Sequence, residues 1–333
     1  MPGTVTSLTV ERQPEGTAKV RWLIEGECTS LDLAWGQGPE PTDLTSIRSV
    51  RPTVTGEVIE GLADGPLYVS VSPIPGTGER VAGIRNLGLA GTTNFRDLGG
   101  YRASGDATVR WGRIFRSDAL LLEDSALSAF GGLHVRTIYD LRSEVEREQS
   151  PNRLPAGNHV ITHLPVVGEE SAREAIEAGL EDGEAFLARL YVQMLEDGAS
   201  SFGALITDLA DLNNLPAVFH CAAGKDRTGM AAALLLLALG VDEKTVLDDY
   251  ELTSTYRTSD PVKAVMARLG EDQKIPAEAV AGILRTPRWA MKAAIDAVNE
   301  HHGGIDGYFT GPGGADAGVL SRLREVLLIR EEG

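Results

Sequence analysis

The chain has 333 residues, of which 42% are hydrophobic, 24% charged and 5% aromatic, and its formal net charge is −17. This apolar content excludes a disordered or collagen-like chain, and the longest apolar run, Met230 to Leu239, is far shorter than the roughly 18 residues of a membrane span. The acidic balance, with no dense cluster of Lys and Arg, argues against a nucleic-acid binder.

Residues 1–84 have the pattern of a small all-β unit. Apolar and polar side chains alternate over 18–24, 31–35 and 67–71. Segments rich in Gly and Pro separate these stretches. Roughly six or seven short strands in this length predict an antiparallel β-sandwich, similar in pattern to fibronectin type III or immunoglobulin-like modules. We interpret it as a structural or docking appendage, the alternative being a domain that binds an unidentified partner or a glycan.

Beyond residue 84, strand-like and helix-like segments alternate, which favours an α/β domain over residues 85–333. An apolar helix is predicted over 229–240, where Gly240 ends it. The tail from Pro261 onward has a mostly helical pattern. The other predicted elements are strands over 135–139, 159–164 and 215–220, an acidic helical segment over 168–195 and a final amphipathic helix over 319–328.

The most informative segment is 218–229, Val-Phe-His-Cys-Ala-Ala-Gly-Lys-Asp-Arg-Thr-Gly. A strand ends at His220, a loop of small residues follows, and the apolar helix begins near 227–228. Successive backbone N–H groups in a loop that meets a helix N-terminus form a concave anion site. The small residues 222–224 let the backbone curl around a tetrahedral anion, and Arg227 can bind phosphate oxygens in a bidentate manner.

Cys221 lies at the mouth of this predicted site. The loop N–H dipoles and Arg227 would stabilise its thiolate form. A thiolate aimed at a bound phosphate is a nucleophile whose target is already positioned. An inert cysteine at a strand end does not explain why Cys221, five residues, Arg227 and Thr228 occur together at a strand-to-helix junction.

The segment His220-Cys-x-x-Gly-Lys-Asp-Arg-Thr-Gly resembles the signature loop of the cysteine-based protein tyrosine phosphatases. More narrowly, it is similar to the bacterial branch related to mycobacterial PtpB, an atypical tyrosine and dual-specificity group. Over about residues 85–330, the further similar segments are Asn94-Phe-Arg-Asp-Leu-Gly-Gly-Tyr101, Gly112-Arg-Ile-Phe-Arg-Ser-Asp-Ala-Leu120, Tyr139-Asp-Leu-Arg-Ser143 and Asp249-Tyr-Glu-Leu-Thr253. The resemblance implies a central sheet flanked by helices, with the signature loop between a strand and a helix.

The resemblance also implies phosphomonoester hydrolysis through a phosphocysteine, with no metal or other cofactor. Cys221 would attack phosphorus, Arg227 would hold the equatorial oxygens, Thr228 would hydrogen-bond the sulfur, and His220 would orient the loop. The implied phosphate-binding residues are Ala222, Ala223, Gly224, Lys225, Asp226, Arg227 and Thr228.

The general acid is less determined than the nucleophile. Many tyrosine phosphatases use an Asp beside Trp and Pro on a mobile loop, and this sequence has no Trp-Pro-Asp. In the resembled branch the Asp inside the signature loop, Asp226, is the expected donor, and Asp118 is the alternative. A donor must reach the leaving oxygen, so only the tertiary structure can separate the two.

Lys225 bears on the substrate, because it places a cation beside the phosphate site. In the resembled families a Gly-Lys pair here accompanies activity on phosphoinositides as well as phosphotyrosine. The expected substrates are phosphotyrosine proteins with dual specificity, and the alternative is a phosphoinositide. Lys225 could instead only balance nearby acidic groups. From another class, the alternative is a phosphate-recognition module with little turnover.

Several further motifs are interpreted as structural. Arg96 and Asp97 are predicted to form a buried pair that buttresses the signature loop, and Asp140 and Arg142 to brace the site from a strand end. His301 and His302 have no companion ligands at metal-site spacing, so they are interpreted as a helix end and no metal site is predicted.

Two irregular segments, 168–196 and 256–283, are where a helical lid over the site is expected, the alternative being ordinary helical packing. Two cysteines, Cys28 and Cys221, form no disulfide framework, and the N-terminus lacks the pattern of a secretory signal. A cytoplasmic location is therefore expected, with signal-less export as the alternative.

Overall fold

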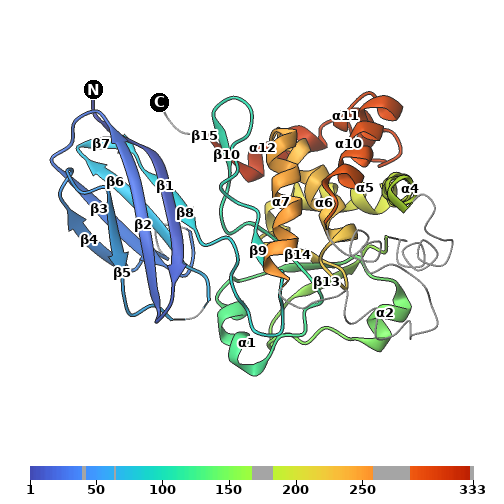
Figure 1. Ribbon diagram of the computed structural model, residues 1–333, viewed down its shortest axis with the longest axis horizontal. Helices are drawn as coiled ribbons and strands as arrows, with labels where there is room; N and C mark the ends of the chain where they lie inside the picture. Colours follow the sequence, from blue (N-terminus) through green and yellow to red (C-terminus); the bar gives the residue numbers. More distant parts are fainter. Residues whose placement is uncertain (40–42, 64, 167–182, 258–285, 331–333) are drawn as a thin grey trace.

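The computed structural model describes residues 1–333 apart from 40–42, 64, 167–182, 258–285 and 331–333. An all-β part occupies one end of the molecule, and a larger part of mixed sheet and helices occupies the other (Figure 1). None of the helices in the described ranges combines the length and the apolar character that crossing a membrane requires.

The all-β part contains two four-stranded sheets, ordered β5-β2-β1-β7 and β4-β3-β6-β8. Buried and more exposed side chains alternate along their strands. In β2, for example, Ala18, Val20 and Trp22 are buried and the residues between them are more exposed. Leu31 and Leu33 of β3 join them in one hydrophobic cluster, so the inner faces of both sheets share a core. The strands are β1 (Gly3–Gln13), β2 (Thr17–Glu25), β3 (Ser30–Gly36), β4 (Ser46–Val50), β5 (Gly56–Ile59), β6 (Tyr68–Ile74), β7 (Gly76–Gly78) and β8 (Arg80–Gly83).

The larger part is built on a five-stranded mixed sheet ordered β13-β12-β14-β11-β9. Its strands are β9 (Arg96–Asp97), β11 (Ile114–Ser117), β12 (Thr137–Asp140), β13 (Val160–His163) and β14 (Ala217–His220). All neighbours pair in parallel except β9, which is antiparallel to β11. A separate ribbon pairs β10 (Ala107–Val109) with β15 (Leu328–Arg330). The predicted central sheet flanked by helices is present.

Helices cover both faces of this sheet, because successive side chains of its strands point to opposite sides. In β14, Phe219 packs into the cluster that contains α6, whereas Val218 packs into the cluster that contains Phe130 of α1. The helices are α1 (Asp124–Gly131), α2 (Glu144–Gln149), α4 (Gly183–Asp197), α5 (Ala199–Leu209), α6 (Asp226–Ala238), α7 (Glu243–Tyr256), α10 (Arg288–His302), α11 (Ile305–Thr310) and α12 (Val319–Leu327), with a 3-10 turn over Leu212–Asn214. In Figure 1, α1 and α2 lie below the sheet and α6, α7 and α10 to α12 above it.

The predicted strands and the apolar helix are found within a few residues of their expected bounds, although α6 begins at Asp226, earlier than expected. Most of the two expected lid segments, 168–196 and 256–283, lies outside the described residues. The described end of the first one is α4, in which Leu187, Tyr191 and Leu195 are buried. This end of the segment is therefore packed into the core as an ordinary helix.

Candidate active site

Three parallel strands bring their carboxyl ends together beside the signature loop. His220, the last residue of β14, is in register with Ser117 of β11 and with Asp140 of β12. In parallel sheets the carboxyl edge is where ligand sites form. The next residue, Cys221, is only 2% exposed, and residues 222–225 connect it to the first turn of α6.

Gly224 gives the loop its shape. Its φ of +65° is a left-handed conformation, and a Cβ here would lie 2.6 Å from the Asp118 nitrogen and 2.8 Å from the Ser117 carbonyl oxygen. Its own carbonyl oxygen accepts hydrogen bonds from Asn94 Nδ2 at 2.8 Å and Arg116 Nη2 at 3.0 Å. The loop is therefore fixed from its outer side by residues that come from distant parts of the chain.

Arg227 is held by Glu146 of α2. Its Nη1 and Nη2 donate to the two carboxylate oxygens at 2.7 and 2.8 Å, and the arginine is 3% exposed. Glu146 also accepts a hydrogen bond from the Ser143 nitrogen, as the third residue of a capping box. The helix start and the guanidinium orientation thus depend on one carboxylate.

Asp226 is the first residue of α6, and its carboxylate meets two groups. Tyr191 of α4 donates a hydrogen bond to Oδ1, and Lys225 Nζ lies 3.2 Å from the same oxygen. Tyr191 also contacts the Tyr250 hydroxyl at 2.5 Å. Burial, followed by the neighbouring Asp226 charge, raises the pKa of Tyr191 well above its ordinary value, so this phenol stays protonated as a donor.

Asp118 has a different setting. Its carboxylate accepts from the backbone nitrogens of Thr93 and Asn94, from the Thr93 hydroxyl and from the Ser117 hydroxyl, at 2.8 to 3.2 Å. These contacts join the end of β11 to the segment that carries Asn94, which in turn holds Gly224. Both oxygens of Asp118 are engaged in bracing this loop.

His220 lies directly before the cysteine and is completely buried. Its Nδ1 is 3.3 Å from the Cys221 carbonyl oxygen, and its Nε2 is 3.3 Å from Asn152 Nδ2. Burial lowers the pKa of His220 to about 4, although the Asp140 carboxylate opposes the shift. The ring is therefore neutral at pH 7 and hydrogen-bonds the backbone of the loop.

The expected brace at the end of β12 is present. Arg142 Nε and Nη2 donate to the two oxygens of Asp140 at 2.9 and 2.7 Å, and both side chains are 1% exposed. Asp140 in turn lies 3.6 Å from His220 Nε2. This pair supports the histidine from behind.

The predicted pair between Arg96 and Asp97 is wrong. These residues are neighbours in strand β9, so their side chains point to opposite faces. Arg96 instead pairs with Asp249 of α7 at 3.1 Å, and Arg116 binds the other oxygen of Asp249 at 2.6 Å. Burial opposes the ionisation of Asp249, but the two guanidinium groups outweigh it and hold its pKa far below the usual range.

Asp97 faces the all-β part of the molecule. It accepts hydrogen bonds from the Tyr68 hydroxyl of β6 and from the nitrogens of Gly99 and Gly112, each at 2.7 Å. Burial raises the pKa of Asp97 to about 6 against these three donors. Asp97 thus joins the two parts of the molecule rather than the signature loop.

Cys221, Asp226 and Arg227 lie in one short stretch between the end of β14 and the first turn of α6. Thr228 follows in the first turn, and its hydroxyl donates to the Ser117 carbonyl oxygen at 3.4 Å. Sequence reasoning missed Glu146 and Tyr191 as partners of the loop. The capping-box spacing Ser143-x-x-Glu146 marked a helix start, but nothing local connected it to Arg227.

His301 and His302 end α10, as interpreted from the sequence. A carboxylate accompanies them: Glu196, at the end of α4, lies against both rings. Sequence spacing could not show it, because the carboxylate comes from another helix.

Residues 87–329 match the sequence profile of the tyrosine phosphatase family. The chain belongs to this family. The expected enzyme class, a protein-tyrosine phosphatase, is confirmed by this membership and by the named relatives. The chain is 29% identical over 282 residues to the triple specificity protein phosphatase PtpB of Mycobacterium tuberculosis, covering 72% of this chain and 98% of that protein.

Two further comparisons complete the family assignment. A tyrosine-protein phosphatase of Nostoc commune is 28% identical over 207 residues, or 61% of this phosphatase and 68% of that protein. The crystal structure of TpbA from P. aeruginosa aligns with 51% of this chain and 98% of its own, at 16% identity and a TM-score of 0.25. A TM-score this low adds nothing to the assignment, which rests on the sequence match.

Proposed function

We propose that this phosphatase hydrolyses phosphotyrosine in proteins, with dual specificity, through a phosphocysteine on Cys221. The observation that carries the proposal is the joint placement of the cysteine and Arg227 by one short loop at the carboxyl end of β14. Gly224, held by Asn94 and Arg116, shapes that loop into the N-terminus of α6. Such a loop offers N–H groups to a phosphate, and the guanidinium adds a planar fork.

In the first proposed step, the Cys221 thiolate attacks phosphorus, and the bond from phosphorus to the tyrosyl oxygen breaks. The leaving oxygen takes a proton from Asp226. In the second step, water attacks phosphorus, gives a proton back to the Asp226 carboxylate, and the S–P bond breaks. This step releases phosphate and regenerates the thiolate. Throughout, Arg227 and the N–H groups of residues 222–227 hold the equatorial oxygens.

Asp226 is favoured over Asp118 as the general acid by their surroundings. Asp118 accepts hydrogen bonds from Thr93, Asn94 and Ser117, so both of its oxygens are occupied. The Asp226 side chain is 34% exposed at the edge of the loop, and Tyr191 and Lys225 orient it from one side. A group that is positioned and still accessible is the better proton donor.

Phosphoinositides are the second candidate substrates. Lys225 is 6% exposed within the loop and lies 3.2 Å from Asp226 Oδ1. A cation there can meet a second phosphate on the substrate. We expect Lys225→Ala to reduce phosphoinositide hydrolysis more than phosphotyrosine hydrolysis, and an equal loss on both would reject a lipid-specific role.

We also propose that residues 1–84 form a separate β-sandwich domain with a docking role. Its two sheets enclose their own hydrophobic cluster, which supports independent folding. Deleting residues 1–84 should leave turnover of a small substrate unchanged while abolishing any partner binding. The Tyr68 hydroxyl on Asp97 would be lost, so a Tyr68→Phe variant should be compared for stability.

The experiment that tests the enzyme proposal is phosphate release from phosphotyrosine, phosphoserine/threonine and phosphoinositide substrates, in EDTA and reductant. Cys221→Ser should abolish all activity, and EDTA should not affect the wild type. Activity that survives in the Cys221→Ser variant would refute the cysteine mechanism. A protein without activity on any substrate, yet able to bind phosphate, would be the phosphate-recognition module.

A further inference from the structure

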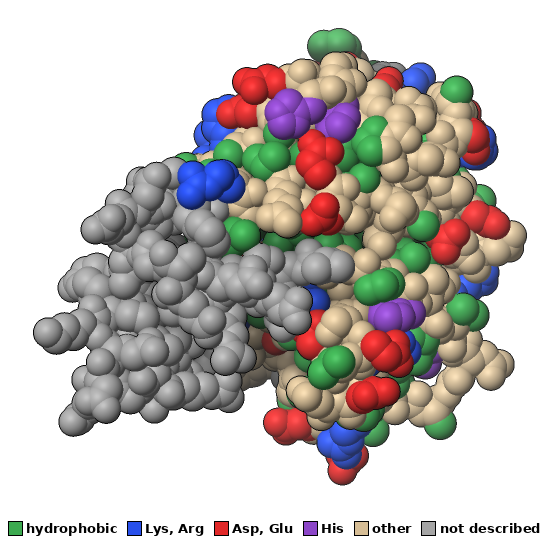
Figure 2. Space-filling view, turned by 90° about the vertical axis from the view of Figure 1, so that its right-hand side faces the viewer, with side chains coloured by type: hydrophobic (Ala, Val, Ile, Leu, Met, Phe, Trp, Pro, Cys, Tyr) green, Lys and Arg blue, Asp and Glu red, His purple; other side chains and the backbone are tan. Residues whose placement is uncertain are grey.

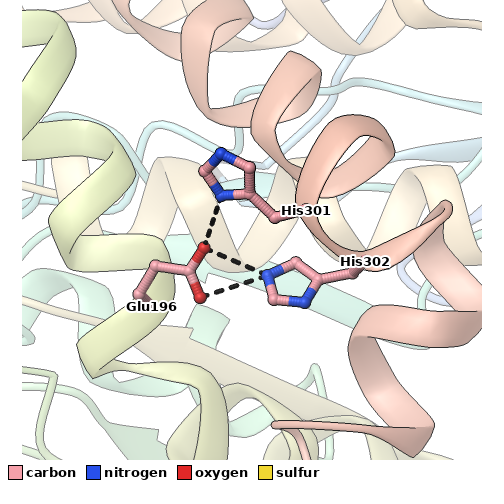
Figure 3. A group of neighbouring side chains, drawn as sticks. All are labelled: Glu196, His301 and His302. Atoms are coloured by element: carbon pink, nitrogen blue, oxygen red, sulfur yellow. Dashed lines mark hydrogen bonds and ion pairs between the residues drawn. The ribbon is translucent and has the colours of Figure 1, made fainter.

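Away from the signature loop, two helices bring a carboxylate and two imidazoles together. Glu196 lies in the last turn of α4, and His301 and His302 are the last two residues of α10 (Figure 3). The two helices pack against each other, so the ends of both meet at the surface. In the described part of the chain, one potential ligand atom from each of these three residues lies within 4.8 Å of the other two.

The distances between the potential ligand atoms are short. Glu196 Oε1 lies 3.1 Å from His301 Nδ1 and 3.0 Å from His302 Nε2, and Oε2 lies 3.1 Å from His302 Nε2. A tetrahedral zinc ion with bonds of about 2.1 Å separates its ligands by about 3.4 Å. Small side-chain rotations therefore suffice to place one ion among the three groups.

The surroundings hold these side chains in place and leave them accessible. His302 is packed edge-on against the Tyr308 ring at 5.3 Å, and the Tyr308 hydroxyl donates to the Leu195 carbonyl oxygen beside Glu196. His301 is 51% exposed and Glu196 35% exposed, so an ion could enter without any opening of the fold. Figure 2, a space-filling view of one face of the molecule, shows histidine side chains beside acidic ones at the surface near the top.

We propose that Glu196, His301 and His302 bind a divalent transition-metal ion, with zinc as the expected ion. Two neutral imidazoles and one carboxylate suit zinc, nickel or copper, whereas calcium and magnesium prefer oxygen ligands alone. Three protein ligands leave a further position for water, as in open zinc sites.

The ion would link the end of α4 to the end of α10. Tyr191, five residues before Glu196 on α4, donates a hydrogen bond to Asp226 in the signature loop. The site therefore lies on the same helix as Tyr191, at a distance from the chemistry. It takes no part in phosphate transfer.

The test is zinc titration by calorimetry of the full-length Cys221→Ser variant, prepared metal-free. Removing the Cys221 thiol matters, because its thiolate would itself bind zinc. We expect one zinc ion per chain and a higher melting temperature with zinc. Glu196→Gln and His301→Asn should each weaken binding at least about tenfold, since loss of a partner outside the ligand shell already costs about that much.

Two exposed residues outside the proposed site provide matched controls. Glu300→Gln removes an exposed carboxylate next to the site on α10, and His134→Asn removes an exposed histidine elsewhere. Both should leave zinc affinity unchanged. Circular dichroism and melting without metal will show whether each variant is folded. If Glu196→Gln does not fold, the His301→Asn variant still tests the proposal.

Two results would overturn the proposal. One is the absence of stoichiometric zinc binding to the folded Cys221→Ser protein, which would leave the three side chains as a hydrogen-bonded helix contact. The other is zinc binding of equal strength in Glu196→Gln and His301→Asn, which would place the ion elsewhere.

Discussion

Arg227 and Glu146 are joined by two parallel hydrogen bonds of 2.7 and 2.8 Å, although 81 residues separate them in the chain. Two hydrogen bonds from one edge of a planar guanidinium fix the orientation of its plane, and this orientation determines where the remaining N–H groups point. Glu146 therefore sets the direction in which Arg227 can meet a phosphate.

Glu146→Gln should reduce kcat/KM by about 10- to 100-fold, because a misoriented guanidinium holds the transferring phosphoryl group poorly. Stability should change little, since Gln preserves the capping box with Ser143. Glu144→Gln is the matched control: this carboxylate lies on the same helix, is 62% exposed and pairs with Arg147. Steady-state kinetics on a small phosphate ester will show the difference, and equal activity of both variants would contradict the role of Glu146.

Gly224→Ala should abolish activity and destabilise the fold. The added methyl group would meet the backbone at Ser117 and Asp118, in addition to the cost of a left-handed alanine, about 1 to 2 kcal/mol. Gly105 provides the control, because its φ is +71° and nothing lies within 4 Å of an added Cβ. Gly105→Ala should show the conformational cost alone, with full activity. Urea denaturation measures both, and similar losses in the two variants would reject the steric argument.

Asp226→Asn should slow hydrolysis of esters with poor leaving groups more than of esters with good ones, since only a poor leaving group needs a proton. Asp118→Asn should instead lower stability and reduce all rates alike, because its carboxylate braces residues 93–94. A series of aryl phosphates of graded leaving-group pKa distinguishes the two. If the rate loss in Asp226→Asn does not depend on the leaving group, that residue is not the acid.

His220 should make stability depend on pH. Its folded pKa of about 4 is below the ordinary value of 6.5, so the unfolded chain binds the extra proton between these values. The contribution of the neutral ring is complete above pH 6.5 and is lost as the pH falls toward 4, on the order of 3 kcal/mol in total. His220→Asn should remove this dependence.

The measurement is the difference in unfolding free energy between wild type and His220→Asn at several pH values. A difference is needed because Asp97, with a pKa raised from 3.8 to about 6, acts with the opposite sign over that range. A constant difference from pH 4 to 7 would show that the histidine does not titrate as expected.

Local features of this protein could be predicted from its sequence alone. The alternation in β2 and β3, the apolar run of α6 and the loop between Cys221 and Arg227 are set by neighbouring residues, because strand and helix periods and helix N-termini are local properties. The family resemblance rested on the same short segments. These features were sufficient to identify the nucleophile and the phosphate-binding loop as candidates.

Only the tertiary structure decided which distant side chains meet. Arg96 pairs with Asp249 and not with its neighbour Asp97, Arg227 with Glu146, Asp226 with Tyr191, and Glu196 with His301 and His302. Each of these contacts joins two elements whose packing depends on the whole hydrophobic core. Sequence spacing carries no information on such a contact, since the chain between the partners can fold back in many ways.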